Sequence, residues 1–271
     1  MSNRKSNTTK LAVVASAVFS VFMAGEASAT AFDGGIPAGW TGVGNYGTLG
    51  ANGVVTTSPE GGNYGWVSTA GGASTLGAND LNIGDETNGS LLRSGVFSAA
   101  AGDSLNFYFN YVTSDGSSYI EYAWARLLDA ALNPVALLFT ARTTPTGDTV
   151  PGFGLPPIEA TIIPTSTPII PGGPSWSALG GSSGDCWLTG CGYTGWIESE
   201  YTIANAGNYI LEFGVVNWAD TAFDSGMAFD GITVGGVPID PNGEVPEPAT
   251  LALVGLGLAG LGALRRRKVA V

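Results

Sequence analysis

The sequence predicts an all-β protein, an antiparallel β-sandwich or jelly roll with a Pro-rich insertion. Several short segments alternate apolar and polar residues with a period of two and are rich in aromatic and β-branched residues. Turns that contain glycine, asparagine or aspartate separate these segments. No long amphipathic helical pattern interrupts them between residues 30 and 244. Two stacked sheets bury such strands better than a fold with helical layers does.

The first part of this region, residues 34–89, is rich in glycine. Trp40, Tyr46, Tyr64 and Trp66 are interleaved with the glycines, and these side chains need burial or a ligand. We therefore expect short strands joined by tight turns, with a structureless linker as the alternative. The further strands are expected at residues 91–97, 105–112, 135–140, 196–203, 209–216 and 227–234.

Residues 119–128 allow two interpretations. Ile120, Trp124, Leu127 and Leu128 follow a helical spacing, but the same segment also fits a strand that returns through residues 135–140. The neighbouring segments are strands, so we favour a hairpin. The end of the last strand, Phe-Asp-Gly-Ile at residues 229–232, looks like galactose-binding-like jelly rolls of secreted proteins.

Residues 143–174 hold 8 of the 15 prolines of the chain. Proline lacks the N–H that a sheet ladder needs, so this segment is predicted to be a long surface insertion and not a central strand. A domain boundary at this place is the alternative.

The first 29 residues have the three parts of a secretory signal peptide. Arg4, Lys5 and Lys10 form a basic region, residues 11–24 are apolar, and Ala27 and Ala29 give a small-residue cleavage site. The segment predicts export through the secretion translocon. An N-terminal membrane anchor is the alternative, but the apolar run is shorter than the roughly 20 residues of a spanning helix.

The C-terminal residues 245–271 also have three parts. A motif of Val245, Pro246, Glu247 and Pro248 precedes an apolar run over 249–264, and a basic cluster follows it: Arg265, Arg266, Arg267 and Lys268. The run predicts a transmembrane helix of roughly 24 Å, which is marginal for a bilayer of about 30 Å. The basic cluster places its end on the cytoplasmic side.

This order of motif, apolar helix and basic cluster closely resembles the PEP-CTERM sorting signal of bacterial exported proteins. The resemblance implies processing by exosortase, a membrane transpeptidase-like protease, near Pro246–Pro248. It also implies a bacterium that makes exopolysaccharide or biofilm matrix, with transfer of the domain to the cell surface or matrix. The alternative is that the apolar run remains as a permanent single-span membrane anchor. In that family the tail is shared by domains of unrelated activity, so it does not identify residues 30–244.

Charge and composition exclude several classes of function. Residues 30–244 contain 3 arginines, no lysine and 20 acidic residues, which gives a net charge of −17. A domain with this charge repels phosphate backbones, so we expect no nucleic-acid partner. The chain has no histidine, which excludes Ser-His-Asp catalysis and the usual catalytic zinc sites. A cation site must therefore use oxygen ligands, and these favour Ca²⁺.

Three kinds of site follow from these residues. Cys186 and Cys191 are predicted to form a disulfide in an oxidising compartment. Trp187, inside that short loop, is the tryptophan most expected to be exposed and is the candidate for stacking on carbohydrate, with burial in the core as the alternative. A group of four aspartates could supply oxygen ligands for Ca²⁺: Asp115, Asp220, Asp224 and Asp230. The alternative is that these carboxylates are solvated turn residues.

The sequence thus predicts a cell-surface or matrix protein that is associated with exopolysaccharide and is not an enzyme. A carbohydrate-binding module that adheres to the exopolysaccharide is the alternative. A third possibility is a secreted glycoside hydrolase, which needs two carboxylates for catalysis. Its candidate residues are Glu121, Glu198, Glu200 and Glu212.

Overall fold

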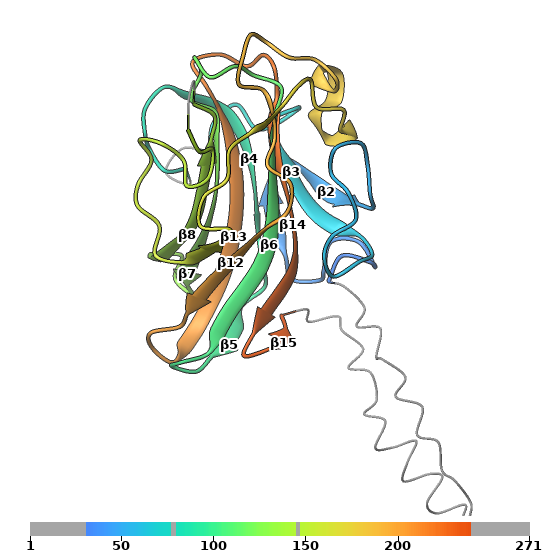
Figure 1. Cartoon of the computed structure of the whole chain (residues 1–271). Coiled ribbons are helices and arrows are strands. Elements are labelled where there is room, and N and C mark those ends of the chain that lie inside the picture. Colours follow the sequence, from blue (N-terminus) through green and yellow to red (C-terminus); the bar gives the residue numbers. More distant parts are fainter. Residues whose placement is uncertain (1–30, 77–79, 145–146, 240–271) are drawn as a thin grey trace, which may run out of the picture.

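The computed structural model describes residues 31–76, 80–144 and 147–239, which form two antiparallel sheets packed face to face (Figure 1). The predicted signal peptide and the predicted sorting tail lie outside the described residues. Among the residues described, no helix is long and apolar enough to cross a membrane. The predicted all-β fold is confirmed.

The first sheet has the strand order β1-β4-β13-β7-β8, and β5 pairs with the beginning of β13. The central strand β13 is paired on both sides, so its residues are buried along almost its whole length. The strands of this sheet are β1 (Thr41–Val43), β4 (Glu86–Arg93), β5 (Phe97–Ala99), β7 (Tyr122–Asp129), β8 (Pro134–Arg142) and β13 (Gly207–Trp218).

The second sheet has the order β10-β11-β6-β14-β3-β2. Strand β12 pairs with the part of β6 that β11 leaves free, β9 extends the sheet beyond β12, and β15 pairs with the end of β14. The strands are β2 (Asn45–Leu49), β3 (Tyr64–Ser68), β6 (Ser104–Thr113), β9 (Thr161–Ile163), β10 (Ile170–Pro171), β11 (Gly192–Tyr193), β12 (Ile197–Thr202), β14 (Ser225–Val234) and β15 (Val237–Pro238).

The predicted strands agree with this arrangement, with one difference. The ambiguous segment 119–128 forms β7 and pairs with β8 as a hairpin. Both faces of β7 are buried, which explains why its apolar residues do not alternate. The run at 91–97 is two strands, because Ser94 leaves the ladder between β4 and β5 and bonds to the backbone of Leu211.

Phenylalanine side chains fill the space between the sheets. Phe109 and Phe139 stack at 3.7 Å between ring centroids, and Phe213 and Phe229 stack at 3.8 Å. Phe107 meets Phe213 edge to face at 5.3 Å. Each stacked pair joins the two sheets, so aromatic packing holds the layers together.

Long loops cover the outer faces of both sheets. On the first sheet, Leu76 packs with Leu91, Tyr122, Trp124 and Val216. On the second sheet, a short 3-10 segment, η2 (Ser177–Ser182), follows Trp176, and both pack over β3 and β14. The described part of the Pro-rich segment lies along the edges, where β9 pairs with β12.

A buried ion triad crosses three strands of the first sheet. Glu212 on β13 is fully enclosed and lies between Arg93 on β4 and Arg126 on β7. Its Oε2 accepts a hydrogen bond from Arg93 Nε at 2.7 Å, and its Oε1 accepts one from Arg126 Nε at 2.5 Å. Trp124 Nε1 also donates to Oε1, at 3.1 Å. The carboxylate is therefore paired and hydrogen-bonded, as a buried charge must be.

We predict that Glu212→Gln lowers the free energy of unfolding by about 3 kcal/mol, because it leaves two partly buried guanidinium groups without their counter-charge. Urea unfolding at pH 7 measures this loss. The matched substitution Glu200→Gln, on the half-buried outer side of β12, is expected to change it by less than about 0.5 kcal/mol. Equal midpoints for the two variants would contradict a stabilising triad.

Candidate functional site

An acidic pocket opens where β6, β12 and β14 lie side by side. Its volume is about 160 Å³, and Tyr108, Glu198 and Asp230 come from three neighbouring strands. Glu60 and Asn106 also line it. We call these five residues the acidic pocket.

A bulge in β14 makes room for this pocket. The pairing of β14 with β6 shifts between Asp230 and Thr233, and Gly231 between them has a φ of 66°. A Cβ at Gly231 would lie 2.8 Å from side-chain carbons of both Glu60 and Tyr108. Glycine is therefore required here by the backbone and by the packing of the pocket.

Asp230 gives the pocket its unusual electrostatics. Its side chain is fully buried, and the nearby donors that act on its carboxyl group are the Ser58 side chain and the Gly231 backbone N–H. Burial raises the pKa of Asp230 to about 6, the charges of Glu60 and Asp33 raise it further, and Ser58 and Gly231 partly lower it. Burial, together with Glu200 and Glu60, also raises the pKa of Glu198.

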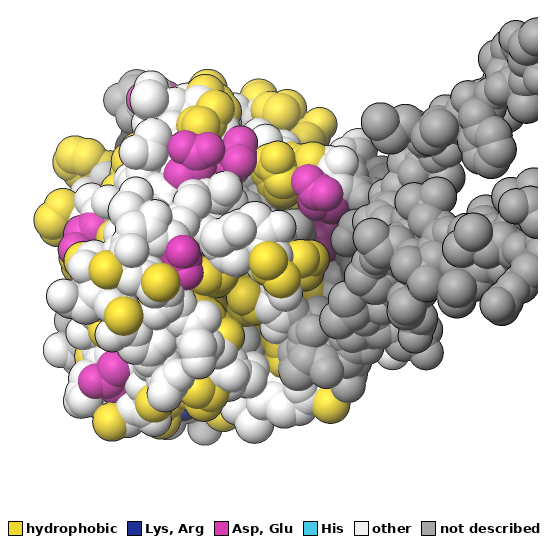
Figure 2. All heavy atoms as spheres, turned by 90° about the horizontal axis from the view of Figure 1, so that it is seen from below, with side chains coloured by type: hydrophobic (Ala, Val, Ile, Leu, Met, Phe, Trp, Pro, Cys, Tyr) yellow, Lys and Arg dark blue, Asp and Glu magenta, His cyan; other side chains and the backbone are white. Residues whose placement is uncertain are grey.

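The pocket can accept hydrogen bonds from hydroxyl or ammonium groups or attract a cation. It repels phosphate and other anions, because three carboxyl groups line it. The surrounding surface has the same sign of charge: seen from below, acidic side chains appear at several separate places, and basic ones are almost absent (Figure 2).

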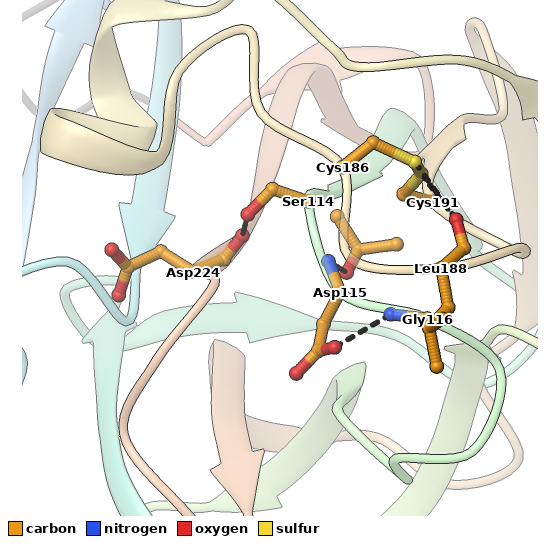
Figure 3. Close-up of a disulfide and its surroundings, with 8 residues drawn as sticks. Ser114, Asp115, Gly116, Cys186, Leu188, Cys191 and Asp224 are labelled. Carbon is orange, nitrogen blue, oxygen red and sulfur yellow. Dashed lines mark hydrogen bonds between the residues drawn. A yellow bond between two sulfur atoms is a disulfide. The ribbon is translucent and has the colours of Figure 1, made fainter.

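The disulfide loop lies at the other end of the sandwich. Cys186 and Cys191 are bonded, as predicted, and Trp187 is 44% exposed. The indole of Trp187 lies 5.2 Å from the ring of Phe223, with an angle of 31° between the planes. The backbone N–H of Trp187 donates to the Ser114 carbonyl, and the backbone N–H of Ser117 donates to the Thr189 carbonyl. The loop that follows β6 therefore supports the disulfide loop (Figure 3).

The four aspartates predicted as one Ca²⁺ cluster are not brought together. Asp224 accepts hydrogen bonds from Thr69 and Ser182, and its carboxyl points away from that of Asp115 (Figure 3). Asp230, on β14, lies in the acidic pocket, six residues after Asp224, which precedes that strand. The charge of Asp220 helps to raise the pKa of Asp115. The carboxyl group of Asp220 itself accepts a hydrogen bond from the Ala222 N–H. In the described part of the chain, no three His, Cys, Asp or Glu residues form a metal-binding group.

The four carboxylates considered for hydrolysis do not share one site, although Glu198 and Glu200 are close enough on β12 for their charges to interact. Glu212 is held by two arginines, and Glu121 is 1% exposed. Glu198 lies in the acidic pocket, but Glu200 does not line it. The partner of Glu198 in the pocket is Asp230, which the sequence suggested only as a calcium ligand.

The sequence reasoning missed Glu60, Asn106 and Tyr108 as pocket residues. Asn106 and Tyr108 were assigned correctly to a strand. In that strand they alternate with the buried core residues Leu105, Phe107 and Phe109. That alternation could have marked them as facing away from the core. It could not indicate which strands lie beside them.

Comparison with known proteins gives one informative match. Residues 244–268 match the PEP-CTERM protein-sorting motif, as the resemblance predicted. The motif indicates an exported protein that is processed by an exosortase-type membrane enzyme. A search of curated proteins found no match.

Solved structures give only a distant similarity. The K1 cleaved adhesin domain of Lys-gingipain from Porphyromonas gingivalis W83 is 14% identical over 76% of this chain and 96% of that chain, with a TM-score of 0.34. The K3 domain of the same protein is 15% identical over 75% and 94%, also with a TM-score of 0.34. Similarity at this level supports no functional conclusion.

We predict that Asp230→Asn stabilises the protein at neutral pH. The folded pKa of about 6 lies above the ordinary value of 3.8, so ionising Asp230 costs stability as the pH rises through this interval. The variant should be more stable at pH 7 by at most about 3 kcal/mol, and the difference should vanish near pH 4. Urea unfolding at both pH values measures it. Asp148→Asn, at an exposed position, serves as the control, and a destabilised Asp230→Asn at pH 7 would refute the prediction.

Proposed function

We propose that this protein is a cell-surface or extracellular-matrix protein that its C-terminal signal delivers through an exosortase system. In this proposal the tail is cut near residues 246–248 and the β-sandwich then associates with exopolysaccharide. The match of residues 244–268 to the sorting motif is the observation that supports it most strongly. The two ends of the chain would then carry signals for export and processing, and residues 30–244 would be the displayed part.

The properties of the sandwich are consistent with display. A net charge of −17 on residues 30–244 favours solubility and opposes self-association. A disulfide closes one of its loops, and disulfides persist in oxidising compartments outside the cytoplasm.

The processing step can be tested in a bacterium that has the exosortase system. We expect the mature protein to end near residues 246–248, as determined by mass spectrometry of its C-terminal peptide. Glu247→Ala should leave most of the protein uncut and ending at Val271, and Glu244→Ala, outside the Pro-Glu-Pro core, should be cut as the wild type is. A surface-exposed wild-type protein that still ends at Val271 would exclude processing.

The second candidate function is adhesion by carbohydrate binding. It is favoured by the exposed Trp187 beside Phe223, because a partly exposed aromatic ring on a supported loop is suited to stacking on a sugar ring. The protein would act by binding and not by catalysis. Glu212 and Glu121, two of the four carboxylates considered for hydrolysis, are enclosed.

If Trp187 stacks on sugar, Trp187→Ala should weaken binding to the polysaccharide of the host matrix by about tenfold. A pull-down with increasing polysaccharide concentration measures the affinity. Leu188→Ala is the matched control, since Leu188 is 64% exposed in the same loop. Absence of wild-type binding to any matrix sugar would eliminate this function, and release of reducing ends during the assay would favour a hydrolase.

A further inference from the structure

Two carboxyl groups are enclosed at the upper end of the sandwich, in the loop between β6 and β7. Asp115 and Glu121 are each 1% exposed. The two groups interact directly, because each perturbs the pKa of the other, although burial is the main reason why both pKa values are raised. A side-chain hydrogen bond links the two carboxyl groups, and the backbone of Trp218 partly lowers the pKa of Glu121.

Asn217 adds an independent observation at the same place. Its side chain is fully buried, and neither Oδ1 nor Nδ2 has a hydrogen-bond partner in the described chain. Asn217 follows Val216, which pairs with Tyr122, so it lies across from Glu121 at the ends of β13 and β7. An enclosed amide without partners is unfavourable and calls for a ligand.

The direction of these side chains follows from the register. Val215 and Ala123 form a pair and belong to the core between the sheets. Alternate residues of a strand share a face, so Asn217 and Glu121 also point between the sheets. The carboxyl of Asp115 points away from the disulfide (Figure 3).

The surrounding groups do not balance both carboxyl groups. Burial lowers the pKa of Arg142, and the charge of nearby Glu121 partly raises it, so this guanidinium is a counter-charge for one carboxylate only. Its Nη1 also donates to the Phe153 carbonyl. The hydroxyl of Tyr111 donates to the backbone carbonyl of Glu121 and not to its carboxyl group. Asp220 adds a further negative charge.

We propose that Asp115, Glu121 and Asn217 bind one Ca²⁺ ion between the sheets, next to the disulfide loop. The ion would receive carboxylate oxygens from Asp115 and Glu121 and the amide oxygen from Asn217. It would neutralise two buried acids and satisfy the unpartnered Oδ1.

The available donors select the class of metal. The chain has no histidine and both cysteines form the disulfide, so soft and nitrogen ligands are unavailable. Carboxylate and amide oxygens suit hard cations. Ca²⁺ accepts irregular sets of six to eight oxygens that include backbone carbonyls, whereas Mg²⁺ requires a near-octahedral arrangement and retains several waters. An enclosed site therefore favours Ca²⁺.

The site would act on the loop that carries Trp187. Asp115 follows Ser114, whose carbonyl accepts the Trp187 N–H, and a Cβ on the next residue, Gly116, would lie 2.3 Å from the Trp187 carbonyl oxygen. These contacts leave little room for the two loops to move separately. A cation that fixes Asp115 would therefore also fix the disulfide loop.

Thermal unfolding of the full chain in detergent solution tests the proposal. With a dissociation constant of about 10⁻⁴–10⁻³ M, as in extracellular modules, about 5 mM Ca²⁺ should raise Tm by roughly 5 °C relative to EDTA. The same concentration of Mg²⁺ should give less than half of this shift. Glu121→Gln should abolish the shift and reduce the calorimetric affinity for Ca²⁺ at least tenfold.

The Tm of Glu121→Gln in EDTA verifies that the variant folds. It should equal or exceed the wild-type value, because the substitution removes a buried acid. Asp224→Asn and Asp230→Asn are the matched controls and should retain the full Ca²⁺ shift. An identical wild-type Tm in Ca²⁺ and EDTA would overturn the proposal and indicate that Asp115 and Glu121 share a proton. A shift that persists in Glu121→Gln or disappears in Asp230→Asn would overturn it as well.

Discussion

The scarcity of basic residues constrains every other charge in this structure. Residues 30–244 contain three arginines, and the ion triad around Glu212 uses Arg93 and Arg126. That triad joins β4, β13 and β7, so the first sheet is fixed where its central strand is most buried. Asp115, Glu121 and Asp230 are buried as well, and Arg142, which interacts with Glu121, cannot balance all three. The remaining carboxyl groups must be protonated or matched by a charge from outside the chain. The acidic pocket and the proposed calcium site are both consequences of this imbalance.

The strands could be predicted well because their patterns reflect burial. Residues 105–112 and 209–216 alternate because their core-facing side chains meet at the aromatic stacks between the sheets. The pattern of 119–128 is obscured because loops cover the outer face of β7 and bury both of its sides. The strands on either side of this segment nevertheless indicate a hairpin strand, which the pairing of β7 with β8 confirms.

The sites could not be predicted because they depend on register. Asp224 and Asp230 are close in the sequence, but six residues of extended strand separate them by roughly 20 Å. Conversely, Tyr108, Glu198 and Asp230 are far apart in the sequence and become neighbours only when β6 pairs with β12 and β14. Glu121 and Asn217 lie opposite each other for the same reason, because β7 pairs with β13 up to Tyr122 and Val216. Composition predicted that a cation site would use oxygens, but not which ones.

Strand β6 determines how the molecule would be presented to its surroundings. Its first residue, Ser104, accepts the Gly235 N–H near β15, and its last residue, Thr113, pairs with Gly192 beside the disulfide. Ten residues of strand place these two ends about 30 Å apart. Figure 1 shows β6 running along the length of the sandwich. If the protein is held at a membrane through its C-terminal end, Trp187 lies on the far side of the sandwich. The disulfide loop and its half-exposed indole ring would then face the medium and not the membrane.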